Sequence, residues 1–279
     1  MYYKYFWIFF FILSLNGSIF SQESRYYSIL KKKEIVISVN KSYEPFFIEE
    51  PNEGFPGFDI ELGNALAEYL GVNAKFIPIG DFDDHLKALN QEKVDITIAG
   101  YSSNLKRARE IHFSDPYLIT TPAGLVNRQN LPPEPEGQIV VVKPFKDILD
   151  LKFQSGISFA VKSSTLNHEF VKLNFENSKI YSYLSNNLAF DALLRNNVNC
   201  FIADGLYIEA LLQKKPSLKV NYLPLLGSVS EEHISMVLPK NDLLFTYKVN
   251  FFIKEMKRSG RIHLLKQKYF NNNGWVKKS

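Results

Sequence analysis

The sequence predicts an α/β protein of two lobes, each a mostly parallel sheet flanked by helices. Two observations predict this fold. Apolar segments of strand length alternate with amphipathic segments of helix length over residues 34–99, and the alternation begins again at residue 159. Residues 130–137, between the two sets, are rich in proline and acidic residues, which is typical of a loop. Because ligands of open α/β sheets bind outside the carboxyl ends of the strands, two such units suggest a crevice between them.

The first set reads as strand, helix, strand, helix, strand. Its predicted elements, in that order, are residues 34–39, 59–70, 74–79, 83–89 and 94–99. The apolar residues of the first helix fall on or near one face, and Gly71 ends it. Strands joined through helices in this way run parallel, so the helices should cover the faces of a parallel sheet.

The second set repeats this order after the proline-rich loop. Its predicted strands are residues 159–161, 179–183 and 198–203. Ser164 or Thr165 caps a helix that runs to residue 173, and residues 189–194 lie in a second helix. Asp204 follows the last strand. The tail over residues 242–269 is predicted to be two helices separated by Gly260.

Residues 1–21 have the features of a secretory signal peptide. The first five residues carry Lys4 and no acid, residues 6–15 are almost wholly apolar, and Ser21 is a small residue at a plausible cleavage point. The apolar run is too short to cross a bilayer comfortably, and an uncleaved signal anchor is the alternative. No cysteine lies near the cleavage region, so we do not expect a lipoprotein. Residues 22–33 are then an N-terminal linker.

Composition excludes several classes of function. Lys and Arg number 33 against 29 Asp and Glu, and they are scattered along the chain, so no nucleic-acid partner is expected. The only cysteine, Cys200, lies in an apolar run and is interpreted as a buried structural thiol. The five histidines lack metal-ligand spacing, and nucleotide-binding and nucleophile-elbow motifs are missing. We therefore expect neither a metal nor a cofactor.

Polar side chains follow three of the predicted strands. Ser102 and Arg107 offer a hydroxyl and guanidinium donors, and Ser164 and Thr165 open a helix, all of which suit a carboxylate. Asp204 has the opposite charge and suits an ammonium. Each has a simpler interpretation. Arg107 could be a solvated surface residue, Ser164 and Thr165 could only cap their helix, and Asp204 could only start a turn. Together at strand ends they favour a receptor for a zwitterion.

Aromatic residues are plentiful near the same strand ends. Tyr43 and Phe82 are the best candidates for walls that pack against a ligand, and Phe46 and Tyr101 are weaker ones. Most of the 23 phenylalanines are expected to be core.

The chain resembles the periplasmic solute-binding proteins of polar amino-acid ABC transporters, which have the type II two-lobed fold. Six motifs carry the resemblance, in order, over residues 35–270. They are Tyr-Glu-Pro-Phe at 43–46, Gly-Phe-Asp-Ile-Glu-Leu at 57–62, the strand at 94–100, Arg107 with Phe-Ser-Asp-Pro-Tyr at 113–117, the segment 161–165, and the strand at 201–204. Three departures are Asn-Leu-Lys before Arg107, Ser163 in place of a glycine, and a longer proline-rich connection.

The resemblance implies how the site would work. Arg107 would grip the ligand α-carboxylate, helped by Ser102 and Thr165, while Asp204 would take the α-ammonium. A backbone group of Gly100 would assist, and Tyr43 and Phe82 would wall the ligand side chain. The resemblance also implies the lobe boundaries. Lobe 1 would comprise residues 34–122 and 234–279, and lobe 2 residues 123–233. Two strands near 120–125 and 233–238 would form the hinge.

The leading hypothesis is a periplasmic binding protein, monomeric and not an enzyme. It would deliver an amino acid or similar small carboxylate to the membrane permease of an ABC transporter. The first alternative is an enzyme on the same fold, a cyclohexadienyl or arogenate dehydratase acting on prephenate-like acids. It would need an acid–base residue beside the ligand, for which Glu44 and Glu231 are candidates. The second alternative is a sensor input domain.

Overall fold

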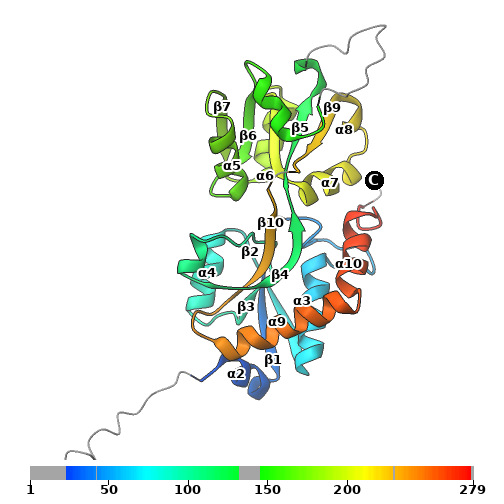
Figure 1. The fold of residues 1–279 in the computed structure, drawn as a ribbon. Helices are drawn as coiled ribbons and strands as arrows, with labels where there is room; N and C mark the ends of the chain where they lie inside the picture. The colour runs from blue at the N-terminus through cyan, green and yellow to red at the C-terminus, as the bar shows by residue number, and fades with distance from the viewer. Residues whose placement is uncertain (1–22, 42, 132–144, 229, 278–279) are drawn as a thin grey trace, which may run out of the picture.

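The computed structural model describes residues 23–41, 43–131, 145–228 and 230–277. The predicted signal peptide and most of the proline-rich loop lie outside these residues. Two five-stranded sheets, each flanked by helices, form two bodies placed one above the other (Figure 1). We call the body around the first sheet lobe 1 and the body around the second sheet lobe 2. The predicted two-lobed α/β fold is confirmed.

The sheet of lobe 1 has the strand order β2-β1-β3-β10-β4. Its strands are β1 (Glu34–Asn40), β2 (Asn73–Ile79), β3 (Ile96–Thr97), β4 (His112–Thr120) and β10 (Glu232–Leu238). Strand β1 pairs parallel with β2 and β3, and β10 pairs antiparallel with β3 and β4. Four strands therefore point one way and β10 points the other way.

Lobe 2 repeats this arrangement in the order β7-β6-β8-β5-β9. Its strands are β5 (Pro122–Asn127), β6 (Ser158–Lys162), β7 (Lys179–Tyr183), β8 (Cys200–Asp204) and β9 (Tyr222–Leu226). Strand β5 is antiparallel to both of its neighbours, and β6 is parallel to β7 and β8. The central strand β8 is buried throughout, and the thiol of Cys200 is buried within it as predicted.

Helices connect these strands, and most lie where the sequence pattern placed them, although the two that begin at residues 205 and 218 were not predicted. In lobe 1 they are α3 (Phe58–Leu70), α4 (Phe82–Asn90), α9 (Leu243–Arg258) and α10 (Arg261–Phe270), and in lobe 2 α5 (Leu166–Asn174), α6 (Asn186–Leu194), α7 (Gly205–Lys214) and α8 (Leu218–Asn221). Short 3-10 turns lie at η2 (Arg107–Arg109), η3 (Arg128–Asn130) and η4 (Ile148–Phe153). Gly260 has a φ of 75° and separates α9 from α10, as predicted. Within the described ranges, no helix is both long and apolar enough to span a membrane.

The predicted N-terminal linker at residues 22–33 is wrong for most of its length. Residues Arg25–Lys32 form helix α2, which begins after Ser24, whose hydroxyl accepts from the backbone N–H of Tyr26. Arg25 pairs with the buried carboxylate of Asp95 at 3.2 Å, and Ile29 is fully buried. These contacts with lobe 1 explain why a basic, surface-like segment is ordered.

The chain crosses between the sheets twice. Strand β4 of lobe 1 passes through Thr121 into β5 of lobe 2, and residues 227–231 connect β9 of lobe 2 to β10 of lobe 1 (Figure 1). The first crossing agrees with the connecting strand expected near residues 120–125. The second precedes the strand expected near residues 233–238, which belongs to β10 in the sheet of lobe 1. The lobe boundaries that we drew at residues 122 and 233 stay a prediction.

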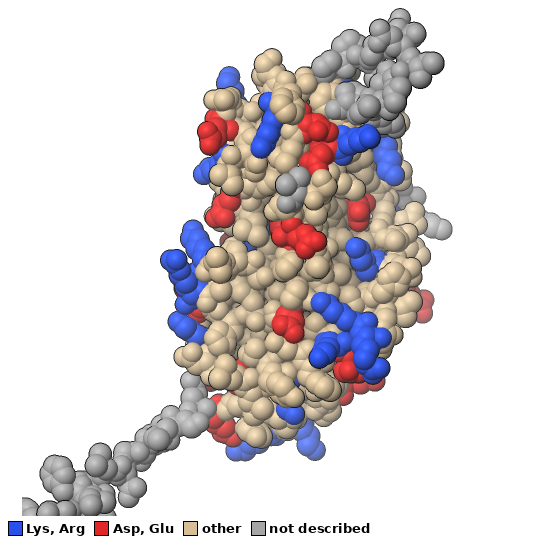
Figure 2. Space-filling view, viewed as in Figure 1, with Lys and Arg blue, Asp and Glu red and all other residues tan. Residues whose placement is uncertain are grey.

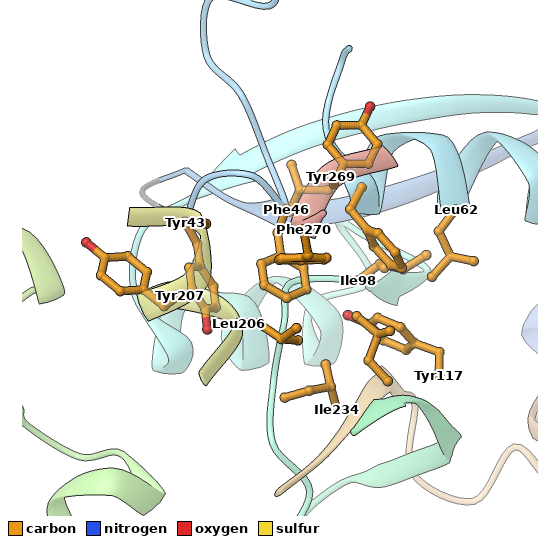
Figure 3. Close-up of a cluster of buried hydrophobic side chains, with 14 of the residues drawn as sticks. Tyr43, Phe46, Leu62, Ile98, Tyr117, Leu206, Tyr207, Ile234, Tyr269 and Phe270 are labelled. Carbon is orange, nitrogen blue, oxygen red and sulfur yellow. The ribbon is translucent and has the colours of Figure 1, made fainter. Parts of the chain in front are cut away.

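Apolar packing continues from one lobe to the other. The largest buried cluster contains residues of both sheets, and Figure 3 shows part of it. Tyr43 of lobe 1 lies between Phe46 of its own lobe and Tyr207 of lobe 2, with ring centroids 4.7 and 5.8 Å away. The crevice between the lobes is therefore closed over aromatic side chains in this structure.

Candidate functional site

Arg107 lies at the first turn after β3, where it reaches across the crevice. The side-chain oxygen of Asn104 accepts from the backbone N–H of Arg107 at 2.8 Å, which begins the short helix η2. The guanidinium donates to the carbonyl oxygen of Ser102 at 2.9 Å and to that of Ser164, in lobe 2, at 3.2 Å. One side chain of lobe 1 thus bonds to the loop that opens helix α5 of lobe 2.

The ring of Phe82 packs against the guanidinium of Arg107. It is the first residue of α4, and the guanidinium carbon of Arg107 lies 4.2 Å from the centre of its ring. Tyr101 packs against the same ring edge-on, with 4.6 Å between centroids. Burial lowers the pKa of Arg107 from its ordinary value, and the ring stacking offsets part of the loss of hydration.

Asp204 lies at the carboxyl end of the buried strand β8 and caps helix α7. Its carboxylate accepts from the backbone N–H of Tyr207 at 3.0 Å and from the hydroxyl of Tyr43. Because the residue is 6% exposed, burial raises its pKa above the ordinary value. Asp204 is thus a helix cap, where the simpler interpretation of the sequence was a turn residue, and the same carboxylate also faces lobe 1.

Tyr43 follows β1 and is held in place by the backbone of Gly100. A Cβ atom on Gly100 would lie 2.8 Å from the Tyr43 ring, so only glycine fits there. The φ of Gly100 is 63°, and its N–H donates to the hydroxyl of Tyr117 at 3.2 Å. Tyr117 in turn donates to the buried carboxylate of Asp59 at 3.1 Å. This chain of bonds fixes the strand end on which Tyr43 rests.

Ser164 and Thr165 lie in the loop of lobe 2 that faces Arg107. Ser164 has a φ of 58° and presents its carbonyl oxygen to the guanidinium. The hydroxyl of Thr165 donates to the carbonyl of Lys162 at 2.8 Å and accepts from the N–H of His168 at 3.2 Å. Thr165 is thus the cap of α5, one of the two interpretations that the sequence left open.

Glu232 was missed by the sequence analysis. Ser102 lies on the strand end next to β10, and its hydroxyl donates to Oε2 of Glu232 at 2.8 Å. Glu232 is 4% exposed, and its Oε1 is buried without a hydrogen-bond partner among the described residues. Burial and, next, the charge of Asp204 raise the pKa of Glu232 to about 7. Alternation counted back from Ile234 and Met236 would have placed this acid on the buried face of the strand.

The two acids considered for an enzyme lie elsewhere. Glu44 forms an ion pair with Lys214 across the crevice, and both side chains remain partly exposed. The side chain of Glu231 is 67% exposed and lies 3.5 Å from His233. Neither has the buried environment that Glu232 has.

A pocket of about 480 Å³ opens beside the site, on the side of Tyr207 and the C-terminal segment. It is lined by Lys41, Glu44, Phe190, Tyr207, Lys214 and Trp275, among others. Arg107 does not line it. The anionic and cationic groups described above are instead covered by the contacts between the lobes.

Basic side chains do not form one continuous surface on the described part of the face shown in Figure 2. On the face shown in Figure 2, Lys and Arg lie in separate groups with acidic and uncharged side chains between them. Among the residues that the structure describes, no group of three or more His, Cys, Asp or Glu is arranged to hold a metal ion.

The chain was compared with protein families and with known proteins. The family described as bacterial extracellular solute-binding proteins, family 3, matches residues 35–272. A similar curated protein is the cyclohexadienyl dehydratase of Pseudomonas aeruginosa, 26% identical over 205 residues, which are 73% of this chain and 70% of the dehydratase. Another is the L-cystine-binding protein TcyJ of Escherichia coli strain K12, 24% identical over 260 residues, 93% of this chain and 91% of that protein.

Solved structures agree on the fold. The ancestral amino acid-binding protein AncCDT-1, a precursor of cyclohexadienyl dehydratase, is 26% identical and superposes with a TM-score of 0.72, covering 88% of this chain and all of that chain. A putative ABC transporter binding component from Wolinella succinogenes, complexed with lysine, gives a TM-score of 0.75 at 24% identity over 88% of this chain and all of that chain.

Proposed function

This chain belongs to the bacterial extracellular solute-binding proteins of family 3, and from that membership we propose that it captures an amino acid between its lobes for an ABC transporter. The ligand is an α-amino acid or a similar small carboxylate. The membrane permease of the transporter is the partner, and the protein acts as a monomer outside the cytoplasm. Export through the signal peptide at residues 1–21, without a lipid anchor, belongs to the same proposal.

One observation carries the proposal. Each lobe presents one charged group to the other lobe: Arg107 reaches from lobe 1 to the carbonyl of Ser164, and Asp204 of lobe 2 accepts from Tyr43. Both contacts are of the kind that a zwitterion makes. A ligand carboxylate would take the guanidinium donors, and a ligand ammonium would take the place of the Tyr43 hydroxyl at Asp204.

The remaining site residues have supporting roles in this proposal. Phe82 holds the guanidinium flat, so that two parallel N–H groups face the carboxylate. Gly100 lets Tyr43 approach the ligand, and Ser102 and the loop of Ser164 and Thr165 flank the carboxylate. A ligand that bonds to both lobes favours the closed arrangement by its extra affinity for that state.

A panel of amino acids tests the proposal. We expect at least one to raise the melting temperature of the mature protein, because a ligand at 100 times its Kd adds about 2.7 kcal/mol of stability. Arg107→Gln should abolish this rise and leave the ligand-free melting temperature near that of the wild type. Arg109→Gln is the matched control, since Arg109 lies in the same short helix and is exposed.

The panel also has a clear negative result. If no amino acid raises the melting temperature, or if Arg107→Gln binds as the wild type does, the zwitterion site is wrong.

An enzyme on the same fold is the second candidate. Two observations favour it: the similarity to a cyclohexadienyl dehydratase and the buried acid Glu232, whose pKa of about 7 suits a general acid. Turnover of a prephenate-like acid by the purified protein, lost in Glu232→Gln, would favour the enzyme over the binding protein.

A further inference from the structure

Glu232 is a buried acid in the crevice, and its second carboxylate oxygen has no hydrogen-bond partner among the described residues. Its Oε2 is held by the hydroxyl of Ser102 at 2.8 Å, which fixes the orientation of the carboxyl group. The other oxygen, Oε1, is fully buried and accepts no hydrogen bond from any described residue. A buried polar atom of this kind is costly and calls for an explanation, of which an absent ligand group is one.

The surroundings of Glu232 decide which ligand group fits. The charged or titratable groups that act on it are Asp204 from β8, Arg107 from η2 and Tyr43 from the segment after β1. Asp204 has the strongest effect of these charges and opposes ionisation of Glu232. The adjacent titratable residues are directed to solvent, since His233 is exposed and pairs with the exposed Glu231, which precedes β10.

We propose that Glu232 is a second carboxylate for the ligand's α-ammonium, which it shares with Asp204. This inference rests on the proposed function. An ammonium group has three N–H donors, and one carboxylate satisfies them only in part. Asp204 already accepts from the backbone of Tyr207, so an oxygen on a second carboxylate supplies the acceptor that remains. The positive charge between the two acids also removes their mutual repulsion.

Ligand binding and proton release are coupled if this assignment is right. Without ligand, Glu232 is about half protonated near pH 7, because its pKa is about 7. An ammonium beside Oε1 favours the ionised form, so the ligand expels the proton. The Kd should then weaken about tenfold for each pH unit below 7 and change little above it.

Isothermal titration calorimetry of the wild type tests the coupling directly. The amino acid found in the panel is titrated into the protein from pH 5 to pH 8, in pairs of buffers that differ in ionisation enthalpy. We expect the release of about half a proton per ligand at pH 7. Uptake of a proton, or a Kd that does not change with pH, would overturn the inference while leaving the amino-acid site intact.

Two variants separate Glu232 from its neighbour. In Glu232→Gln the affinity should be about tenfold weaker at pH 8, and its pH dependence should be lost. Glu231→Gln, one residue away and exposed, should keep both the affinity and the proton release. The des-amino analogue of the ligand should bind the wild type and Glu232→Gln with equal affinity. A loss of its binding in the variant would instead assign Glu232 to the carboxylate end of the ligand. Failure of the whole amino-acid panel would instead reject the proposed function.

Discussion

At the scale of single residues, Gly100 shows how closely the site is packed. Its φ of 63° favours glycine, and its Cα lies against the ring of Tyr43. That ring carries the hydroxyl that bonds to Asp204 of the other lobe. A change at Gly100 therefore acts on the contact between the lobes through one intermediate side chain.

We expect Gly100→Ala to displace Tyr43, because the new Cβ would lie 2.8 and 3.0 Å from two atoms of the ring. The cost should be about 2 kcal/mol of folding stability, the usual cost of overpacking, with a large loss of ligand affinity. Gly54→Ala is the matched control, since Gly54 has a φ of 77° but nothing within 4 Å of its Cβ position. Thermal denaturation and ligand titration of both variants distinguish the effect of the contact with Tyr43 from the effect of backbone strain at a positive φ. Equal losses in the two variants would remove Tyr43 from the explanation.

The candidate residues show where sequence reasoning stops at this scale. Arg107, Asp204 and Tyr43 could be placed after predicted strands. The opposite charges of Arg107 and Asp204 there indicated a site for a zwitterion. Whether Thr165 faces a ligand or caps a helix depends on the rotation of one hydroxyl, which no pattern specifies. Residue type alone does not separate Glu232 from Glu231, and only the alternation along β10 indicates which of the two is buried.

At the scale of elements, helix α2 was the largest departure from expectation. Its residues were assigned to an N-terminal linker, and its lysines do lie on the exposed side of the segment. The other side is anchored by Ser24, which bonds to Asp242 at the start of α9, and by Arg25 on Asp95. Tertiary contacts of this kind determine whether a short helix forms, and they cannot be read from a local pattern.

Removing Arg25 should destabilise lobe 1. Its side chain is 10% exposed and that of Asp95 only 5%, so the pair is largely shielded from water. Breaking such a pair from one side leaves a buried charge, which costs about 3 kcal/mol. We therefore expect Arg25→Ala to shift the midpoint of urea denaturation well below that of the wild type. Lys31→Ala, on the exposed side of the same helix, should change it little. Equal midpoints for Arg25→Ala and the wild type would show that α2 does not stabilise the lobe.

At the scale of the whole molecule, the order of elements was enough to predict two α/β lobes, whereas the two connecting strands were expected from the family resemblance. Alternation of strands and helices indicates the sheets. The interruption near residue 130, expected between the two sets, follows β5 of lobe 2, since the chain already crosses at Thr121. The contacts that close the crevice could not be predicted, because they join residues more than fifty positions apart in the sequence. The end of α7 is the main example: Gln213 donates to the carbonyl of Phe270 and accepts from the indole of Trp275 at 3.2 Å.

These contacts join lobe 2 to the C-terminal segment across the closed crevice, so they should favour the closed state without any ligand. A hydrogen bond contributes about 1 kcal/mol, whereas the partly exposed pair of Lys214 and Glu44 contributes less. Gln213→Ala should therefore weaken ligand binding about fivefold, through the closure equilibrium, although Gln213 lies outside the proposed ligand contacts.

Small-angle X-ray scattering distinguishes this mechanism from a direct effect on the site. Without ligand, Gln213→Ala should have a larger radius of gyration than the wild type, and at saturating ligand the two should coincide. Lys219→Ala, on the exposed surface of α8 in the same lobe, should match the wild type in both states. Weaker binding by Gln213→Ala with an unchanged radius of gyration would mean that the end of α7 acts on the ligand site and not on closure.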